Sequence, residues 1–97
     1  MHAIHWKKQA INDLIKIGLH IAKDSPANAE KMLDLIEDKV TPLATHAELG
    51  RIGRKRGTRE LIAHENDVVI YRVLNEKLEI LRVKHTAQQW PAMDQIS

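Results

Sequence analysis

The sequence contains no cysteine and no phenylalanine, and its 97 residues include only two tryptophans and one tyrosine. The lack of cysteine excludes disulfide bonds and thiolate metal ligands, and it suits a reducing compartment. Because aromatic side chains are scarce, aliphatic residues must fill the core. No apolar run approaches the roughly 18 residues of a membrane-spanning helix, and no signal-like segment opens the chain. We therefore expect a cytoplasmic protein with no membrane partner.

The sequence also lacks the motifs of several enzyme classes. Its six histidines are scattered without zinc-site spacing, so we expect no metal site and no cofactor. The glycines of residues 50–57 have neither the spacing of a phosphate-binding loop nor a strand before them. The only serines are Ser25, a candidate helix cap, and Ser97, so a catalytic serine is excluded.

The net charge of +2 is unevenly distributed. Residues 1–50 hold six Lys and seven Asp or Glu (net −1), whereas residues 51–97 hold nine Lys or Arg and six Asp or Glu (net +3). Four of these nine cations lie within residues 51–56. Such a basic patch indicates an anionic partner, either nucleic acid or an acidic protein segment, and the alternative is a solvated loop.

Three runs with strand composition lie at residues 58–64, 68–73 and 78–84. The short polar breaks at 65–67 and 75–77 contain asparagines that tolerate a positive φ, so the runs predict an antiparallel meander. Residues 3–5 form a further short candidate strand at or beside the sheet edge. We expect residues 47–57 to be the irregular, most mobile loop.

Two amphipathic helices precede the meander. An apolar stripe at three- and four-residue steps predicts the first helix from Trp6, with Asp13 among the charged residues on its solvent face. Gly18 in this helix indicates close approach of a second helix. Ser25 and Pro26 fit the cap and first position of that second helix, which should kink or end near Pro42.

These elements predict a two-layer α+β domain of order β-α-α-β-β-β, with a helical hairpin packed on a small antiparallel sheet. No linker or internal repeat is visible, so we expect one domain over residues 1–91 and a flexible tail at 92–97.

Several segments carry a family resemblance: Gly50-Arg51, residues 57–62 (GTRELI), residues 70–73 (IYRV), and His85 followed by Gln89-Trp90-Pro91. In order and spacing they resemble the ParE branch of the ParE/RelE toxin superfamily of bacterial type II toxin–antitoxin modules. The resemblance implies a toxin that inhibits DNA gyrase by binding and is neutralised by a cognate antitoxin in a hetero-oligomer. It implies contact with DNA only through antitoxin or gyrase.

The residues expected to bind a partner are the loop cations and three residues near the strands: Arg51, Arg54, Lys55, Arg56, Arg59, His85 and Trp90. Trp90 could instead pin the tail onto the body, which we favour, and His85 could be a hydrogen-bonded structural residue. We interpret Glu60 as a surface charge and Tyr71 as a core residue with its hydroxyl at a layer edge.

The alternative function is a ribosome-dependent endoribonuclease of the RelE kind, with Arg59, Arg82 and His85 as candidate catalysts. The RelE branch uses a tyrosine near the C-terminus, and no tyrosine follows Tyr71 here. We therefore predict no catalytic residues. A non-toxic nucleic-acid-binding module is a third possibility, and it would need more cations than one loop supplies.

Overall fold

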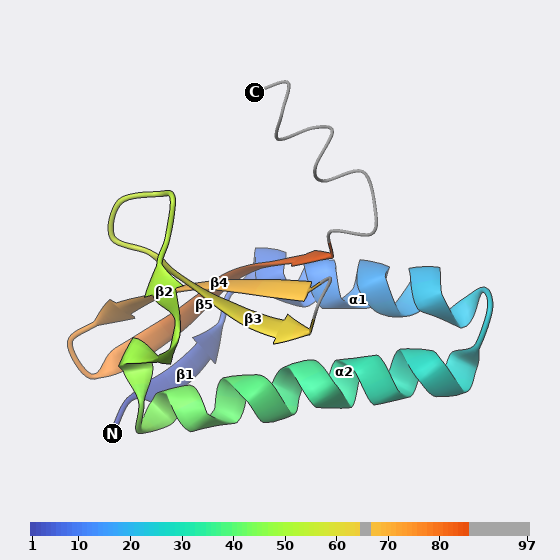
Figure 1. The fold of residues 1–97 in the computed structure, drawn as a ribbon, viewed down its shortest axis with the longest axis horizontal. Helices are drawn as coiled ribbons and strands as arrows, with labels where there is room; N and C mark the ends of the chain where they lie inside the picture. The colour runs from blue at the N-terminus through green and yellow to red at the C-terminus, as the bar shows by residue number, and fades with distance from the viewer. Residues whose placement is uncertain (65–66, 86–97) are drawn as a thin grey trace.

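The computed structural model describes residues 1–64 and 67–85, in which two helices cover one face of a five-stranded sheet (Figure 1). In chain order the elements are β1 (Ala3–Trp6), α1 (Lys8–Ala22), α2 (Pro26–Val40), two 3-10 helices (Thr41–Ala44 and Ala47–Leu49), β2 (Arg51–Ile52), β3 (Arg59–His64), β4 (Asp67–Leu74) and β5 (Lys77–His85). The predicted α+β class and two-layer arrangement are confirmed. Neither helix is long and apolar enough to cross a membrane, within the residues described.

The strand order is β1-β5-β4-β3-β2. The predicted meander of β3, β4 and β5 is antiparallel, and Asn75 has the expected positive φ, 54°, in the turn between β4 and β5. The edge strand at the N-terminus is also confirmed, but it runs parallel to β5, with Ala3 opposite Lys77. The sheet is therefore mixed rather than wholly antiparallel. Predictions for residues 65, 66 and 86–97, including Trp90, lie outside the described residues.

The starts of the two helices have different causes, one distant in sequence and one local. Helix α1 begins at Lys8 and not at Trp6, because Trp6 pairs with Ile80 in the sheet. Ser25 caps α2 as predicted, since its hydroxyl accepts a hydrogen bond from the Asn28 N–H (3.2 Å), and Pro26 is the first helical residue. Helix α2 ends at Val40, and Pro42 lies in the following 3-10 helix.

The two helices approach each other at Gly18, as predicted. A Cβ atom at Gly18 would lie 3.2 Å from Leu33 Cδ1, tighter than an ordinary van der Waals contact. The helices and sheet enclose a largely aliphatic core that includes Tyr71; its largest fully buried apolar members are Ile17, Ile36, Val40, Leu43, Val69, Tyr71, Leu78, Ile80 and Val83. The prediction that Tyr71 is a core residue is thus confirmed.

Residues 47–57 contain more regular secondary structure than predicted. They contain a 3-10 helix and β2, whose Arg51 and Ile52 pair with Glu60 and Arg59 of β3. Gly53 closes the loop by donating its N–H to the Thr58 carbonyl (2.8 Å). A Cβ at Gly53 would lie 2.3 Å from the Thr58 hydroxyl oxygen, so the tight hairpin requires glycine there.

Candidate functional site

One face of the sheet packs against the helices, and no other element within residues 1–64 and 67–85 covers the opposite face, which we call the open face. Alternation along β4 places Val69 and Tyr71 in the core and Ile70 and Arg72 on the open face. In β5 the register shifts opposite the step from Ile70 to Tyr71, so that Leu81 is an extra residue between paired positions. The open face, together with the loop between β2 and β3, is where the cationic side chains gather.

Tyr71 fixes the chain before β2 from within the core. Its hydroxyl donates to the Ala47 carbonyl (2.6 Å) and accepts from the Gly50 N–H (2.8 Å). Burial raises the pKa of the Tyr71 hydroxyl, although the Gly50 hydrogen bond opposes the shift. A Cβ at Gly50 would lie 2.6 Å from that hydroxyl oxygen, which explains why glycine stands there.

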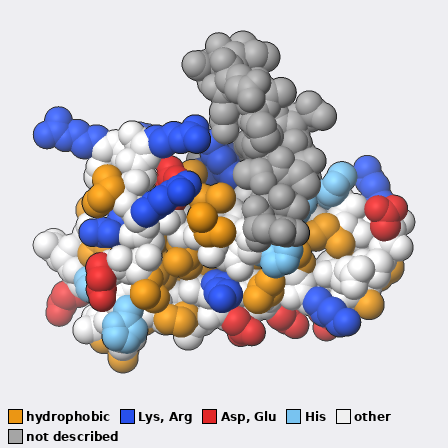
Figure 2. All heavy atoms as spheres, viewed as in Figure 1, with side chains coloured by type: hydrophobic (Ala, Val, Ile, Leu, Met, Phe, Trp, Pro, Cys, Tyr) orange, Lys and Arg blue, Asp and Glu red, His pale blue; other side chains and the backbone are white. Residues whose placement is uncertain are grey.

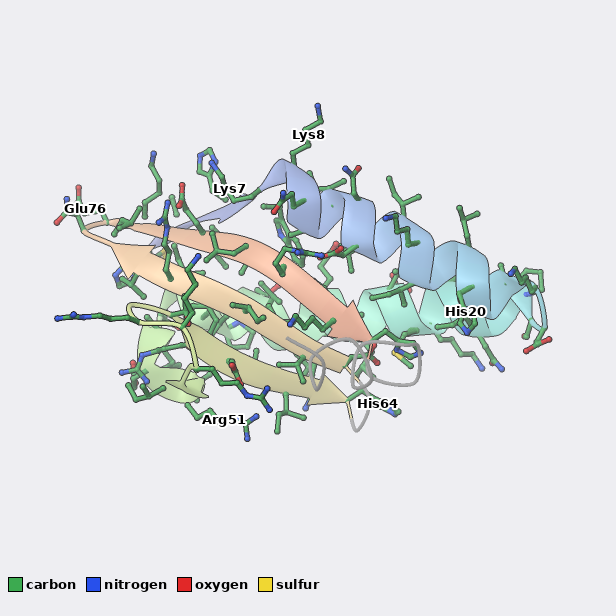
Figure 3. The ribbon with its side chains drawn as sticks, turned by 90° about the horizontal axis from the view of Figure 1, so that it is seen from above. Lys7, Lys8, His20, Arg51, His64 and Glu76 are labelled. Carbon is green, nitrogen blue, oxygen red and sulfur yellow. The ribbon has the colours of Figure 1, made fainter. Side chains whose placement is uncertain are left out.

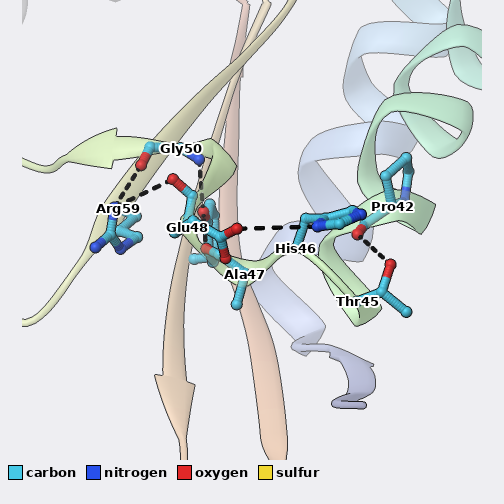
Figure 4. Close-up of polar contacts among 8 residues, drawn as sticks. Pro42, Thr45, His46, Ala47, Glu48, Gly50 and Arg59 are labelled. Carbon is cyan, nitrogen blue, oxygen red and sulfur yellow. Dashed lines mark hydrogen bonds and ion pairs between the residues drawn. The ribbon is translucent and has the colours of Figure 1, made fainter.

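Arg59 belongs to the same network. Figure 4 shows its guanidinium directed at the chain before β2, where it donates to the carbonyls of Gly50 (2.6 Å) and Glu48 (3.5 Å). Arg59 is half-buried, and its hydrogen bonds stabilise the backbone of this segment. Its predicted roles in partner binding or catalysis stay predictions. What the structure shows is that Arg59 stabilises the chain before β2.

Glu60 is more than the surface charge that we predicted. Its side chain is 11% exposed, and it accepts from the Arg51 guanidinium (3.1 Å) and the Arg54 backbone N–H (3.2 Å). Burial acts to raise the pKa of Glu60, but these two partners outweigh it, and the pKa lies below its ordinary value. The carboxylate thus ties β2 and the basic loop to β3.

We expect Glu60→Gln to destabilise the protein by about 1 kcal/mol at neutral pH. A lowered folded-state pKa contributes stability above the unfolded value, and this stability is lost as the pH falls through the folded pKa. The difference between wild type and Glu60→Gln, measured by urea denaturation, should therefore shrink below about pH 4. Glu37→Gln, an exposed carboxylate on α2, is the control. A difference that does not vary with pH would contradict the assignment.

Asp13 was wrongly predicted to face solvent. It is 5% exposed and accepts two hydrogen bonds from the Arg82 guanidinium (2.8 and 3.1 Å) and one from the Val83 N–H (2.9 Å). The Asp13 hydrogen bond raises the pKa of Arg82. This contact joins α1 to β5 across 69 residues of sequence, and it engages the arginine that the alternative function would use as a catalyst.

His85 is buried at the end of β5. Its Nδ1 lies 2.5 Å from Oδ1 of the fully buried Asp67, and its ring is 6.2 Å from that of His20. His64 Nδ1 lies 3.8 Å from the other oxygen of Asp67. The structure therefore shows His85 as a hydrogen-bonded residue, which was the alternative to a partner-binding role. No group of three His or acidic residues suited to a metal ion occurs within residues 1–64 and 67–85.

The three candidate catalysts do not converge. Arg59 contacts the carbonyls before β2, Arg82 contacts Asp13 on α1, and His85 contacts Asp67 at the far end of the sheet. The groove on the open face includes Arg82 but neither Arg59 nor His85. The structure thus divides these groups among three separate sets of contacts.

Of the predicted partner-binding residues, Arg51 is exposed on β2, and Arg54, Lys55 and Arg56 are exposed on the loop between β2 and β3. Figure 2 shows Lys and Arg side chains gathered in this region. The structure adds cations that periodicity alone did not single out. Lys7 and Lys8 precede and begin α1, and Arg72 and Lys84 lie on the open face of the sheet. Only the alternation of the strands could have indicated the last two.

Comparisons with known proteins agree with this fold. The family model described as ParE toxin of type II toxin–antitoxin system matches residues 4–90. A protein called Y4kP from Sinorhizobium fredii is 38% identical over 88 residues, covering 91% of this chain and 92% of that protein. Toxin RelE3 from Caulobacter vibrioides is 30% identical over 93 residues, covering 92% and 99%.

Among solved structures, the chromosomal ParDE system from P. aeruginosa has a TM-score of 0.79 and 27% identity, over 88% of this chain and 96% of that one. The family model spans the helices and every strand from the parallel edge strand to β5. The chain therefore belongs to the ParE family of toxins of type II toxin–antitoxin systems, within the ParE/RelE superfamily.

Proposed function

We propose that this toxin inhibits DNA gyrase by binding to it, without cleaving a covalent bond itself, and that a cognate antitoxin neutralises it. The family supports the first part, because ParE-type toxins are associated with gyrase. The observation that carries the proposal is the separation of Arg59, Arg82 and His85, each held by a different partner.

Cleavage of RNA requires a base near the 2′-hydroxyl, cations at the phosphate and a proton donor at the leaving oxygen. The Arg59 guanidinium is directed at backbone carbonyls, and the His85 side chain is 8% exposed. Tyr71 is fully buried, with its hydroxyl bonded to two backbone groups. These contacts support a binding function over an endoribonuclease.

Helix α1 offers a surface for the antitoxin. Ile11, Ile15 and Leu19 follow one another at four-residue steps and are 44%, 54% and 65% exposed. An exposed apolar stripe of this kind fits an amphipathic helix of a partner. Two exposed cations, Arg51 of β2 and Arg56 of the loop that follows it, would pair with acidic residues of that partner. We propose a toxin–antitoxin hetero-oligomer on this basis.

The test is a supercoiling assay with purified toxin and gyrase. We expect loss of supercoiling, or accumulation of cleaved plasmid, that depends on gyrase and is reversed by the antitoxin encoded beside the toxin. Messenger RNA on translating ribosomes should remain intact under the same conditions. Site-specific transcript cleavage with normal gyrase activity would contradict the proposal and favour the RelE-type alternative.

A further inference from the structure

A basic groove lies on the open face of the sheet. It has a volume of about 550 Å³, and seven of its twelve lining residues are Lys or Arg, whereas one, Glu60, is acidic. The cations come from three parts of the chain: the start of α1, the loop between β2 and β3, and strands β4 and β5. In Figure 3 Lys7 and Lys8 lie at the start of α1, and Arg51 lies across the sheet, at the edge formed by β2.

Part of this charge has no counterion in the described structure. Arg72 pairs with Glu79 (2.7 Å), Lys7 approaches the same carboxylate (3.7 Å), and Arg82 pairs with Asp13. Glu60, the acidic lining residue, is already engaged by Arg51 and by the Arg54 N–H. The side chains of Lys8, Arg54 and Lys55 form no ion pair with any residue in 1–64 or 67–85. Because Glu60 also attracts the Arg54 guanidinium electrostatically, the cations of the groove without a nearby counterion among the described residues are Lys8 at the start of α1 and Lys55 in the loop between β2 and β3.

We propose that this groove binds the phosphate backbone of double-stranded DNA. The inference rests on the proposed function in one respect, because the duplex would be the one on which gyrase acts. Lysine and arginine side chains that contact phosphates position a protein on a duplex without reading its sequence. The toxin would thus bind both the enzyme and its DNA, whereas the family resemblance implies contact with DNA only through antitoxin or gyrase.

The lining favours a duplex over a single strand. Proteins that bind single-stranded nucleic acid stack successive bases on aromatic side chains. None of the lining residues is aromatic, and the apolar ones are Ile70 and Leu81, which are half-buried in the sheet. The groove therefore offers charge for a backbone and no platform for unpaired bases.

The position of the groove also disfavours an extended acidic peptide. It lies over β4, which pairs with β3 and β5, and over β5, which pairs with β1 at residues 77–80 and with β4 alone among the described strands at residues 81–85. The Val83 N–H in that last segment is already bonded to Asp13, so a peptide could add a strand there only by displacing this carboxylate. A phosphate backbone needs only the side-chain cations.

Binding can be measured by fluorescence anisotropy of a labelled duplex with purified toxin over a range of salt concentrations. The groove variant Lys8→Gln/Arg54→Gln/Lys55→Gln removes the three unpaired cations. We expect it to bind at least about tenfold more weakly and to lower the magnitude of the salt slope, d log K/d log [salt], by about three. The matched control, Lys23→Gln/Lys31→Gln/Lys39→Gln, removes the same charge from exposed positions after α1 and on α2.

Duplex binding that is lost in the groove variant and kept in the control supports the inference, provided that both variants melt at the wild-type temperature. Absence of duplex binding by the wild type, or equal losses in both variants, would overturn it. So would complete displacement of the duplex by equimolar single-stranded RNA or by a glutamate-rich peptide. The assay contains no gyrase, so its failure and a failure of the supercoiling test can be told apart.

Discussion

Asp13→Ala should destabilise the protein by about 3 kcal/mol, because it removes the partner of Arg82 and leaves the buried Val83 N–H without an acceptor. Arg82 is partly exposed, with 36% of its side-chain surface accessible, so water replaces some of the lost interaction and the estimate stays at the low end for a buried pair. For a domain of this size the melting temperature should fall by about 12 °C or more.

Two variants make this result specific. Asp13→Asn keeps an oxygen for the Val83 N–H while removing the charge, so we expect a smaller loss than with alanine. Asp34→Ala makes the same substitution at an exposed position of α2 and should change stability by less than about 0.5 kcal/mol. Equal effects of Asp13→Ala and Asp34→Ala would show that the contact contributes nothing to folding.

Tyr71→Phe should cost about 1–3 kcal/mol, because both the Gly50 N–H and the Ala47 carbonyl lose the hydroxyl that satisfies them. The benzyl group stays in the core, so the loss reports the hydrogen bonds and not packing. Hydrogen exchange gives a local readout. The Gly50 amide should exchange faster in Tyr71→Phe than in wild type, relative to amides in the middle of α2.

If the Gly50 amide kept its protection, the hydroxyl would not be what orders the chain before β2. A second variant checks the geometry. Gly50→Ala places a Cβ 2.6 Å from the Tyr71 hydroxyl oxygen and 3.0 Å from the Glu60 carbonyl oxygen, so it should also destabilise the protein. Because the two positions touch, the effects of Gly50→Ala and Tyr71→Phe should not add in the double variant.

Local patterns predicted the elements well. The β-branched runs gave the meander, and Ser25 with Pro26 gave the start of α2, because both signals depend on neighbours in sequence. Trp6 was assigned to the helix because it continues an apolar stripe at helical spacing. Its place in β1 depends on pairing with Ile80, which no local pattern reveals. The two-residue strand β2 was missed because it is too short for any periodicity to be visible.

The site was predictable only in part. The basic loop is a run in sequence and was found as such, whereas the cations of β4 and β5 are separated by core residues and meet only in the folded sheet. Asp13 looked like one more charge on a solvent-facing stripe, and its partners lie 69 and 70 residues away. Glu60 accepts a hydrogen bond from Arg51 because β2 pairs with β3, and the sequence did not indicate β2.

The parallel pairing of β1 with β5 has a consequence for folding during synthesis. The first and the last strand of the described residues pair with each other, residue 3 with residue 77, and the Asp13 contact likewise requires β5. A nascent chain therefore cannot complete its sheet until nearly all of it has left the ribosome, and contacts so distant in sequence slow folding. Each newly made molecule therefore passes through an interval in which its sheet is incomplete.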